Sequence, residues 1–150
     1  MESFRQGLAL GADGIEFDVR VSRDGVPVVI HDATLERTTD GAGRVDAHPV
    51  GALRALDAGY RFTPDGGRTF PYRGQGIRIP LLDEVLEAFP QTPCIIELKT
   101  RAATEALASA IDRLSSNNSS HSRQRYSYSG IGRSVDASRG WWWPGRCGRG

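Results

Sequence analysis

Residues 14–32 read GIEFDVRVSRDGVPVVIHD, and this stretch decides the fold class. Apolar and charged residues alternate strictly from Ile15 to Val21, which predicts a strand with one apolar face and one charged face. Asp24-Gly25 is a dipeptide typical of tight hairpin turns, and residues 26–30 form a second apolar run. The stretch therefore predicts a β-hairpin that ends at His31.

The geometry of this hairpin depends on the length of its turn. If Asp24-Gly25 alone form the turn, Asp18 lies opposite His31, and Glu16 points to the same face of the sheet. A loop with one more residue would instead place Phe17 opposite His31 and turn the histidine to the other face. The shorter turn predicts a cluster of two carboxylates and an imidazole.

Flanking segments predict further helices and strands. Leu82, Val85, Leu86 and Phe89 follow Pro80 at helical spacing, and residues 59–79 lack any regular pattern. The other expected elements are a helix over 3–10, a short helix within 50–58, a strand over 94–99 and a helix over 102–114. This order predicts an α/β domain, most simply part of a barrel or an open sheet.

The composition limits the class of protein. The chain has 150 residues, a formal net charge of +1 and two cysteines, which suits one soluble domain or part of a larger one. It has no apolar run that could span a membrane, and two cysteines support neither a disulfide framework nor a usual zinc site. No secretory signal opens the chain, which favours the cytoplasm, although the start of the protein is expected to be missing.

The last 36 residues differ in kind from the rest. Residues 1–114 carry a net charge of −4, whereas residues 115–150 carry +5, with nine serines, six glycines and three consecutive tryptophans at 141–143. Without an apolar period this tail is expected to be disordered. A basic tail that binds nucleic acid is one explanation. We favour a shifted reading frame in GC-rich DNA, and expect neither a nucleic-acid partner nor a function here.

A second acidic segment supplies the rest of a candidate site. Glu97 and Lys99 alternate with apolar residues in the strand expected over 94–99. They lie at its C-terminal end, which is where α/β barrels place their active sites. Glu16, Asp18 and Glu97 together would suit a hard divalent cation, Mg²⁺ or Ca²⁺. His31 would then act as general acid or base, and Lys99 would hold a phosphoryl oxygen.

Six motifs resemble the glycerophosphodiester phosphodiesterase family, in order and at suitable spacing. They are GADGIEFDV at 11–19, DGVPVVIHD at 24–32, LERTTDG at 35–41, LDAG at 56–59, IPLLDEVL at 79–86 and IELK at 96–99. The resemblance covers about residues 2–114. It implies a TIM-type (β/α)₈ barrel, of which this chain would hold roughly the first half without the first strand.

The resemblance also implies roles for individual residues. Glu16, Asp18 and Glu97 match the family's metal ligands, His31 matches a catalytic histidine that protonates the leaving alcohol, and Lys99 matches a phosphate-binding lysine. A segment at about 33–79 would form an inserted subdomain that shapes the pocket for the substrate, a small-molecule glycerophosphodiester.

Departures from the family pattern limit these expectations. The His-Arg-Gly motif of the family's first strand has no match, and about half a barrel is expected beyond Leu114. We therefore expect a family member truncated at both ends and weak or inactive as a catalyst. The alternatives are a non-catalytic remnant that binds a phosphorylated ligand, and phospholipase D-like cleavage of lipids. Neither the headgroup, the metal nor the oligomeric state follows from the sequence.

Overall fold

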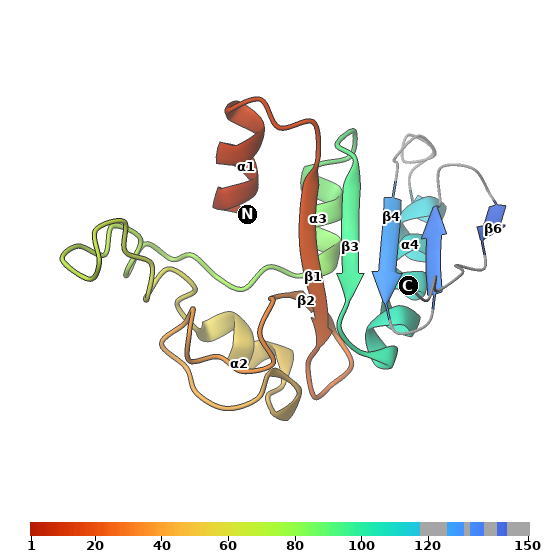
Figure 1. Ribbon diagram of the computed structural model, residues 1–150. Helices are drawn as coiled ribbons and strands as arrows, with labels where there is room; N and C mark the ends of the chain where they lie inside the picture. Colours follow the sequence, from red (N-terminus) through yellow and green to blue (C-terminus); the bar gives the residue numbers. More distant parts are fainter. Residues whose placement is uncertain (118–125, 131–132, 137–140, 144–150) are drawn as a thin grey trace, which may run out of the picture.

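A six-stranded sheet forms the centre of the molecule in the computed structural model, which describes residues 1–117, 126–130, 133–136 and 141–143 (Figure 1). The strands follow the order β2-β1-β3-β4-β5-β6, and β3 runs parallel to both β1 and β4. The strands are β1 (Ile15–Val21), β2 (Pro27–Val29), β3 (Cys94–Leu98), β4 (Tyr126–Gly130), β5 (Arg133–Asp136) and β6 (Trp141–Trp143). The helices are α1 (Glu2–Ala9), a 3₁₀ turn η1 (Val45–Ala47), α2 (Val50–Ala55), α3 (Leu82–Ala88) and α4 (Arg101–Asn117).

Helices α3 and α4 cover one face of the sheet (Figure 1). The predicted alternation of β1 is confirmed, because Ile15, Phe17 and Val19 are buried against these helices, among Leu86 and Leu107. Helix α1 adds Phe4, whose ring lies 5.6 Å from that of Phe17. Since this face carries the apolar core, the charged residues of β1 must point to the opposite face.

The register of the hairpin corrects the expectation of a two-residue turn. Val19 pairs with Val29, and Ser22 donates its N–H to the Val26 carbonyl at 3.0 Å, so that three residues form the turn. The third is Gly25, whose φ of +83° lies in the left-handed region that favours glycine. The extra residue shifts the pairing by one, and Asp18 therefore lies opposite Ile30 rather than His31.

The segment between β2 and α3 projects from the sheet and has a small core of its own (Figure 1). That core contains Ile30, Leu35, Val45, Leu53 and Ile79 of the segment, together with Val28 of β2. Arg54 of α2 connects the segment to α3, because its guanidinium binds both carboxylate oxygens of Glu84 at 2.7 and 2.6 Å. As expected, residues 59–79 contain neither helix nor strand.

The tail also differs from expectation. Helix α4 continues to Asn117, and β4, β5 and β6 lie in a region where no regular element was predicted. Strand pairing uses backbone groups, so it does not require the apolar period on which the prediction relied. The rest of the tail lies outside the described residues. None of the described helices has the length and apolar character that crossing a bilayer requires.

Candidate active site

Three carboxylates from two neighbouring strands lie together on the face of the sheet opposite the helices. Asp18 of β1 is in direct register with Glu97 of β3, and Glu16 lies two residues earlier on β1. Each of the three offers an oxygen within 4.8 Å of those of the other two. The parallel pairing of strands distant in sequence therefore assembles the cluster that the sequence predicted.

Lys99 brings a positive charge into this cluster. Its Nζ lies 2.7 Å from Glu97 Oε1 and 2.9 Å from Asp18 Oδ1. Hydrogen bonding to Glu97, and then to Asp18, raises the pKa of the Lys99 ammonium above its ordinary value. The lysine therefore stays protonated, and it offsets part of the repulsion between these carboxylates.

Asp18 is the most enclosed member of the cluster, with 9% of its surface exposed. Its buried Oδ1 atom faces the Lys99 ammonium at 2.9 Å. A buried carboxylate oxygen requires a positive charge or a donor beside it, and Lys99 supplies that charge here. A metal ion held by the cluster would take over this role from Lys99.

His31 lies outside the carboxylate cluster. The shifted register removes it from the position opposite Asp18, and its side chain is 64% exposed. Its Nδ1 lies 2.7 Å from Asp32 Oδ1, and its carbonyl accepts a hydrogen bond from Arg20 Nε at 2.9 Å. The predicted meeting of the imidazole with Asp18 across the hairpin is therefore wrong, whereas the clustering of the carboxylates is confirmed.

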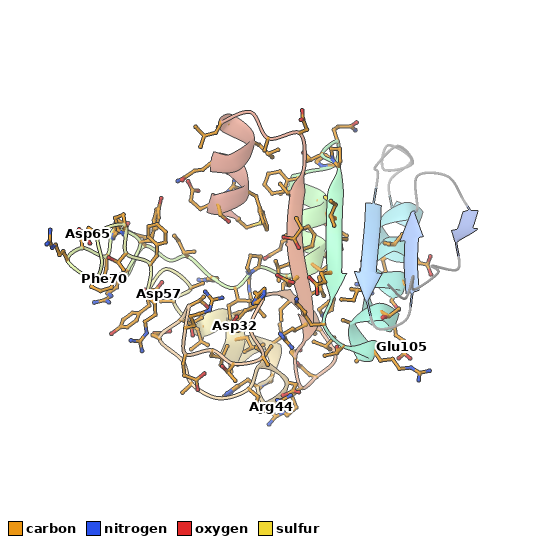
Figure 2. The ribbon with its side chains drawn as sticks, in the orientation of Figure 1. Asp32, Arg44, Asp57, Asp65, Phe70 and Glu105 are labelled. Carbon is orange, nitrogen blue, oxygen red and sulfur yellow. The ribbon has the colours of Figure 1, made fainter. Side chains whose placement is uncertain are left out.

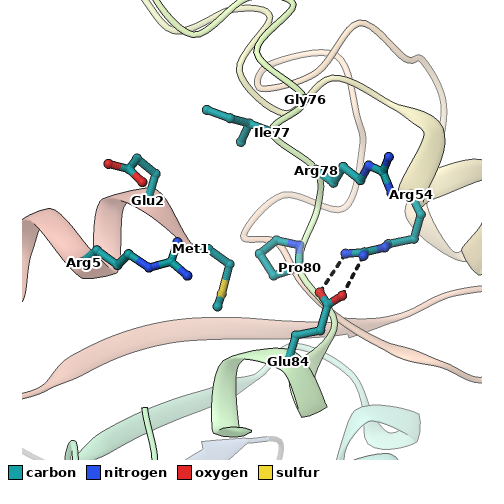
Figure 3. A pocket seen from close by; sticks show the side chains of 9 residues that line it. All are labelled: Met1, Glu2, Arg5, Arg54, Gly76, Ile77, Arg78, Pro80 and Glu84. Carbon is teal, nitrogen blue, oxygen red and sulfur yellow. Dashed lines mark hydrogen bonds and ion pairs between the residues drawn. The ribbon is translucent and has the colours of Figure 1, made fainter. Parts of the chain in front are cut away.

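Two cavities lie next to α1, and one of them also reaches the hairpin. One, of about 370 Å³, is lined by His31, Arg37 and Arg78 together with the aromatic pair Phe62 and Tyr72. The other, of about 450 Å³, lies between α1 and the segment before α3, and the Arg54–Glu84 pair forms part of its wall (Figure 3). The first cavity presents an imidazole and two guanidinium groups, of which that of Arg37 is bound to Asp32.

The sequence pattern predicts no role for Asp32 or Arg37, although the two are joined in the structure. Arg37 Nε donates to Asp32 Oδ2 at 2.5 Å, and Nη2 donates to Oδ1 at 2.9 Å. These bonds to Arg37, and then the bond to His31, hold the pKa of the Asp32 carboxyl far below its usual range. The adjacency of His31 and Asp32 was the available signal, but the contribution of Arg37 depends on the course of the chain.

Comparison with solved structures shows that the fold is that of TIM-barrel phosphodiesterases. A glycerophosphodiester phosphodiesterase of Agrobacterium tumefaciens is similar with a TM-score of 0.69 and 34% identity, over 85% of this chain and 49% of that one. The model of the glycerophosphoryl diester phosphodiesterase family matches residues 1–134. The chain therefore belongs to this family.

Other similar proteins are also named as phosphodiesterases. A glycerophosphodiester phosphodiesterase of Caldanaerobacter subterraneus is 39% identical over 100 residues, which are 67% of this chain and 38% of that protein. An Oleispira antarctica phosphodiesterase in complex with the product sn-glycerol-3-phosphate is similar with a TM-score of 0.63 and 28% identity, over 86% of this chain and 50% of that one. The chain thus spans between about a third and a half of the length of these relatives.

Proposed function

We propose that this chain carries the divalent-metal site and the general acid of a glycerophosphodiester phosphodiesterase. The observation that supports the proposal most strongly is the convergence of three carboxylates from β1 and β3, of which Asp18 is nearly buried. Family membership supports hydrolysis of phosphoric diesters as the reaction class.

The donor set fits a hard cation. Glu16, Asp18 and Glu97 offer only oxygen ligands, which Mg²⁺ and Ca²⁺ prefer, and the described residues near them add no cysteine or histidine ligand that would favour zinc. When bound, such an ion neutralises phosphate charge and activates a hydroxyl for attack on phosphorus. The three carboxylates would hold the ion in place on the open face of the sheet.

Lys99 and His31 would act on the substrate itself. The Lys99 ammonium, now shared between Asp18 and Glu97, lies where it could bind a phosphate oxygen as a point charge. His31, exposed at the wall of the 370 Å³ cavity, would give the proton at Nε2 to the departing alcohol oxygen. The products would be an alcohol and glycerol phosphate.

Hydrolysis of glycerophosphocholine by the purified chain tests this function. We expect slow, metal-dependent release of glycerol phosphate, at a rate well below that of full-length relatives. Chelation by EDTA and the substitution His31→Gln should each reduce it by at least ~100-fold. Lysophosphatidylcholine, run in parallel, distinguishes cleavage of free diesters from cleavage of lipids. Binding of glycerol phosphate without turnover of either substrate would contradict the proposal and favour a ligand-binding role.

A further inference from the structure

Two neighbouring side chains restrain His31 at the cavity: Asp32 contacts its ring, and Arg37 binds Asp32 in turn. Asp32 Oδ1 lies 2.7 Å from the Nδ1 atom of the imidazole, and Arg37 binds both oxygens of Asp32. The three groups form a continuous array from a guanidinium through a carboxylate to an imidazole. All three come from one stretch of seven residues that follows β2.

The ionised carboxylate in the middle of this array determines which groups donate the hydrogen bonds and which accept them. An ionised carboxylate can only accept hydrogen bonds, so the short contact with Asp32 requires a proton on Nδ1 of His31. Arg37 donates two charge-assisted bonds, which favour the ionised form of Asp32 and hold its plane in one orientation. The other ring nitrogen, Nε2, is then the one that can exchange a proton with a ligand.

The restraint on His31 matters because its side chain is exposed to solvent. His31 and Arg37 are 64% and 63% exposed at their side chains, whereas Asp32 is only 23% exposed. An imidazole this open to solvent would otherwise sample several rotamers and both tautomers. The less exposed carboxylate of Asp32, which contacts both side chains, restricts the orientation of the imidazole.

We propose that Asp32 and Arg37 are positioning residues, which keep one proton on Nδ1 of His31 and direct its Nε2 atom toward the cavity. The doubly protonated ring then gives its Nε2 proton to the leaving alcohol and remains as the Nδ1–H tautomer. The inference rests on the proposed role of His31 as general acid. A carboxylate that orients a histidine in this way is a recurrent device in acid–base catalysis. Neither residue need touch the substrate to act on the reaction.

The chain contains a matched control for this array. Arg44 and Asp46 form a second two-pronged pair, with contacts of 2.9 and 2.6 Å, and no hydrogen bond of this pair reaches His31. Figure 2 shows Asp32 near the hairpin and Arg44 at the outer edge of the projecting segment. Asp46→Asn therefore removes the same kind of interaction at a site without the histidine.

Long-range ¹H–¹⁵N NMR of the histidine-labelled full chain tests the proposal, with the His31 signals assigned by their loss in His31→Gln. At mildly alkaline pH, we expect the wild type and Asp46→Asn to carry the ring proton on Nδ1. Asp32→Asn should move the majority of it to Nε2, because a neutral amide accepts more weakly than a carboxylate. Arg37→Gln should give a mixture of both tautomers, and it serves as the second variant if Asp32→Asn does not fold.

A wild-type His31 with its proton on Nε2, or a tautomer that neither variant changes, would overturn the proposal. Steady-state kinetics separates it from the function itself. Where the chain turns over glycerophosphocholine, Asp32→Asn should lower kcat at least ~10-fold with KM little changed, and Asp32→Glu should restore part of the loss. An Nδ1–H His31 in an inactive chain would support the array and contradict the proposed function.

Discussion

Asp18→Asn is expected to abolish the stabilisation that Mg²⁺ or Ca²⁺ gives to the folded chain. A cation that binds only the folded state stabilises it by about 2.7 kcal/mol at a concentration 100 times its Kd. For a domain of this size the corresponding rise in Tm is roughly 5–10 °C. Asp18 should dominate this effect, because it is the least exposed carboxylate of the cluster and lies between the other two along the paired strands.

Thermal unfolding followed by circular dichroism, with and without each cation, measures this effect. Asp46→Asn is the matched control, since Asp46 is paired with Arg44 on the surface and should leave the cation-dependent rise intact. Comparing each variant with and without cation removes any change in its basal stability. A rise in Tm that persists in Asp18→Asn would show that the cation binds elsewhere.

Leu86→Ala is expected to destabilise the chain by about 2–5 kcal/mol. Leu86 is fully buried in the core between α3 and the sheet, so truncation both removes apolar contact and leaves a cavity. Total stabilities of domains are roughly 5–15 kcal/mol, so this loss would unfold a substantial fraction of molecules in a marginal case.

Urea unfolding measures this difference, with Leu10→Ala as the control. Leu10 is 89% exposed beyond the end of α1, so its truncation should change the free energy of unfolding by less than about 0.5 kcal/mol. Equal effects of the two substitutions would contradict the placement of α3 against the sheet.

Strand β1 was predictable because its pattern is local. Alternation from Ile15 to Val21 predicted both the buried face and the acidic face of β1 without knowledge of any partner. The turn was not predictable to the residue, since Asp24-Gly25 occurs in turns of two and of three residues. A difference of one residue was enough to move His31 away from Asp18.

The carboxylate cluster required information that local rules do not contain. Asp18 and Glu97 lie opposite each other in a parallel ladder, although 79 positions separate them in the chain. Parallel strands need a long crossover connection, and its length does not set the register. The rule that α/β barrels place active sites at strand ends predicted that Glu97 joins the site, and the family resemblance agreed, but neither predicted the register. The sharing of Lys99 between Asp18 and Glu97 became visible only in three dimensions.

Isothermal titration calorimetry with Mg²⁺ and with Ca²⁺ tests most directly whether acidic side chains from β1 and β3 share one ion. We predict sub-millimolar binding of one ion to the wild type and at least ~10-fold weaker binding to Glu97→Gln. Lys99→Met should bind at least as tightly as the wild type, because it removes a cation that competes for Asp18 and Glu97. Equal affinities of the wild type and Glu97→Gln would contradict the shared site.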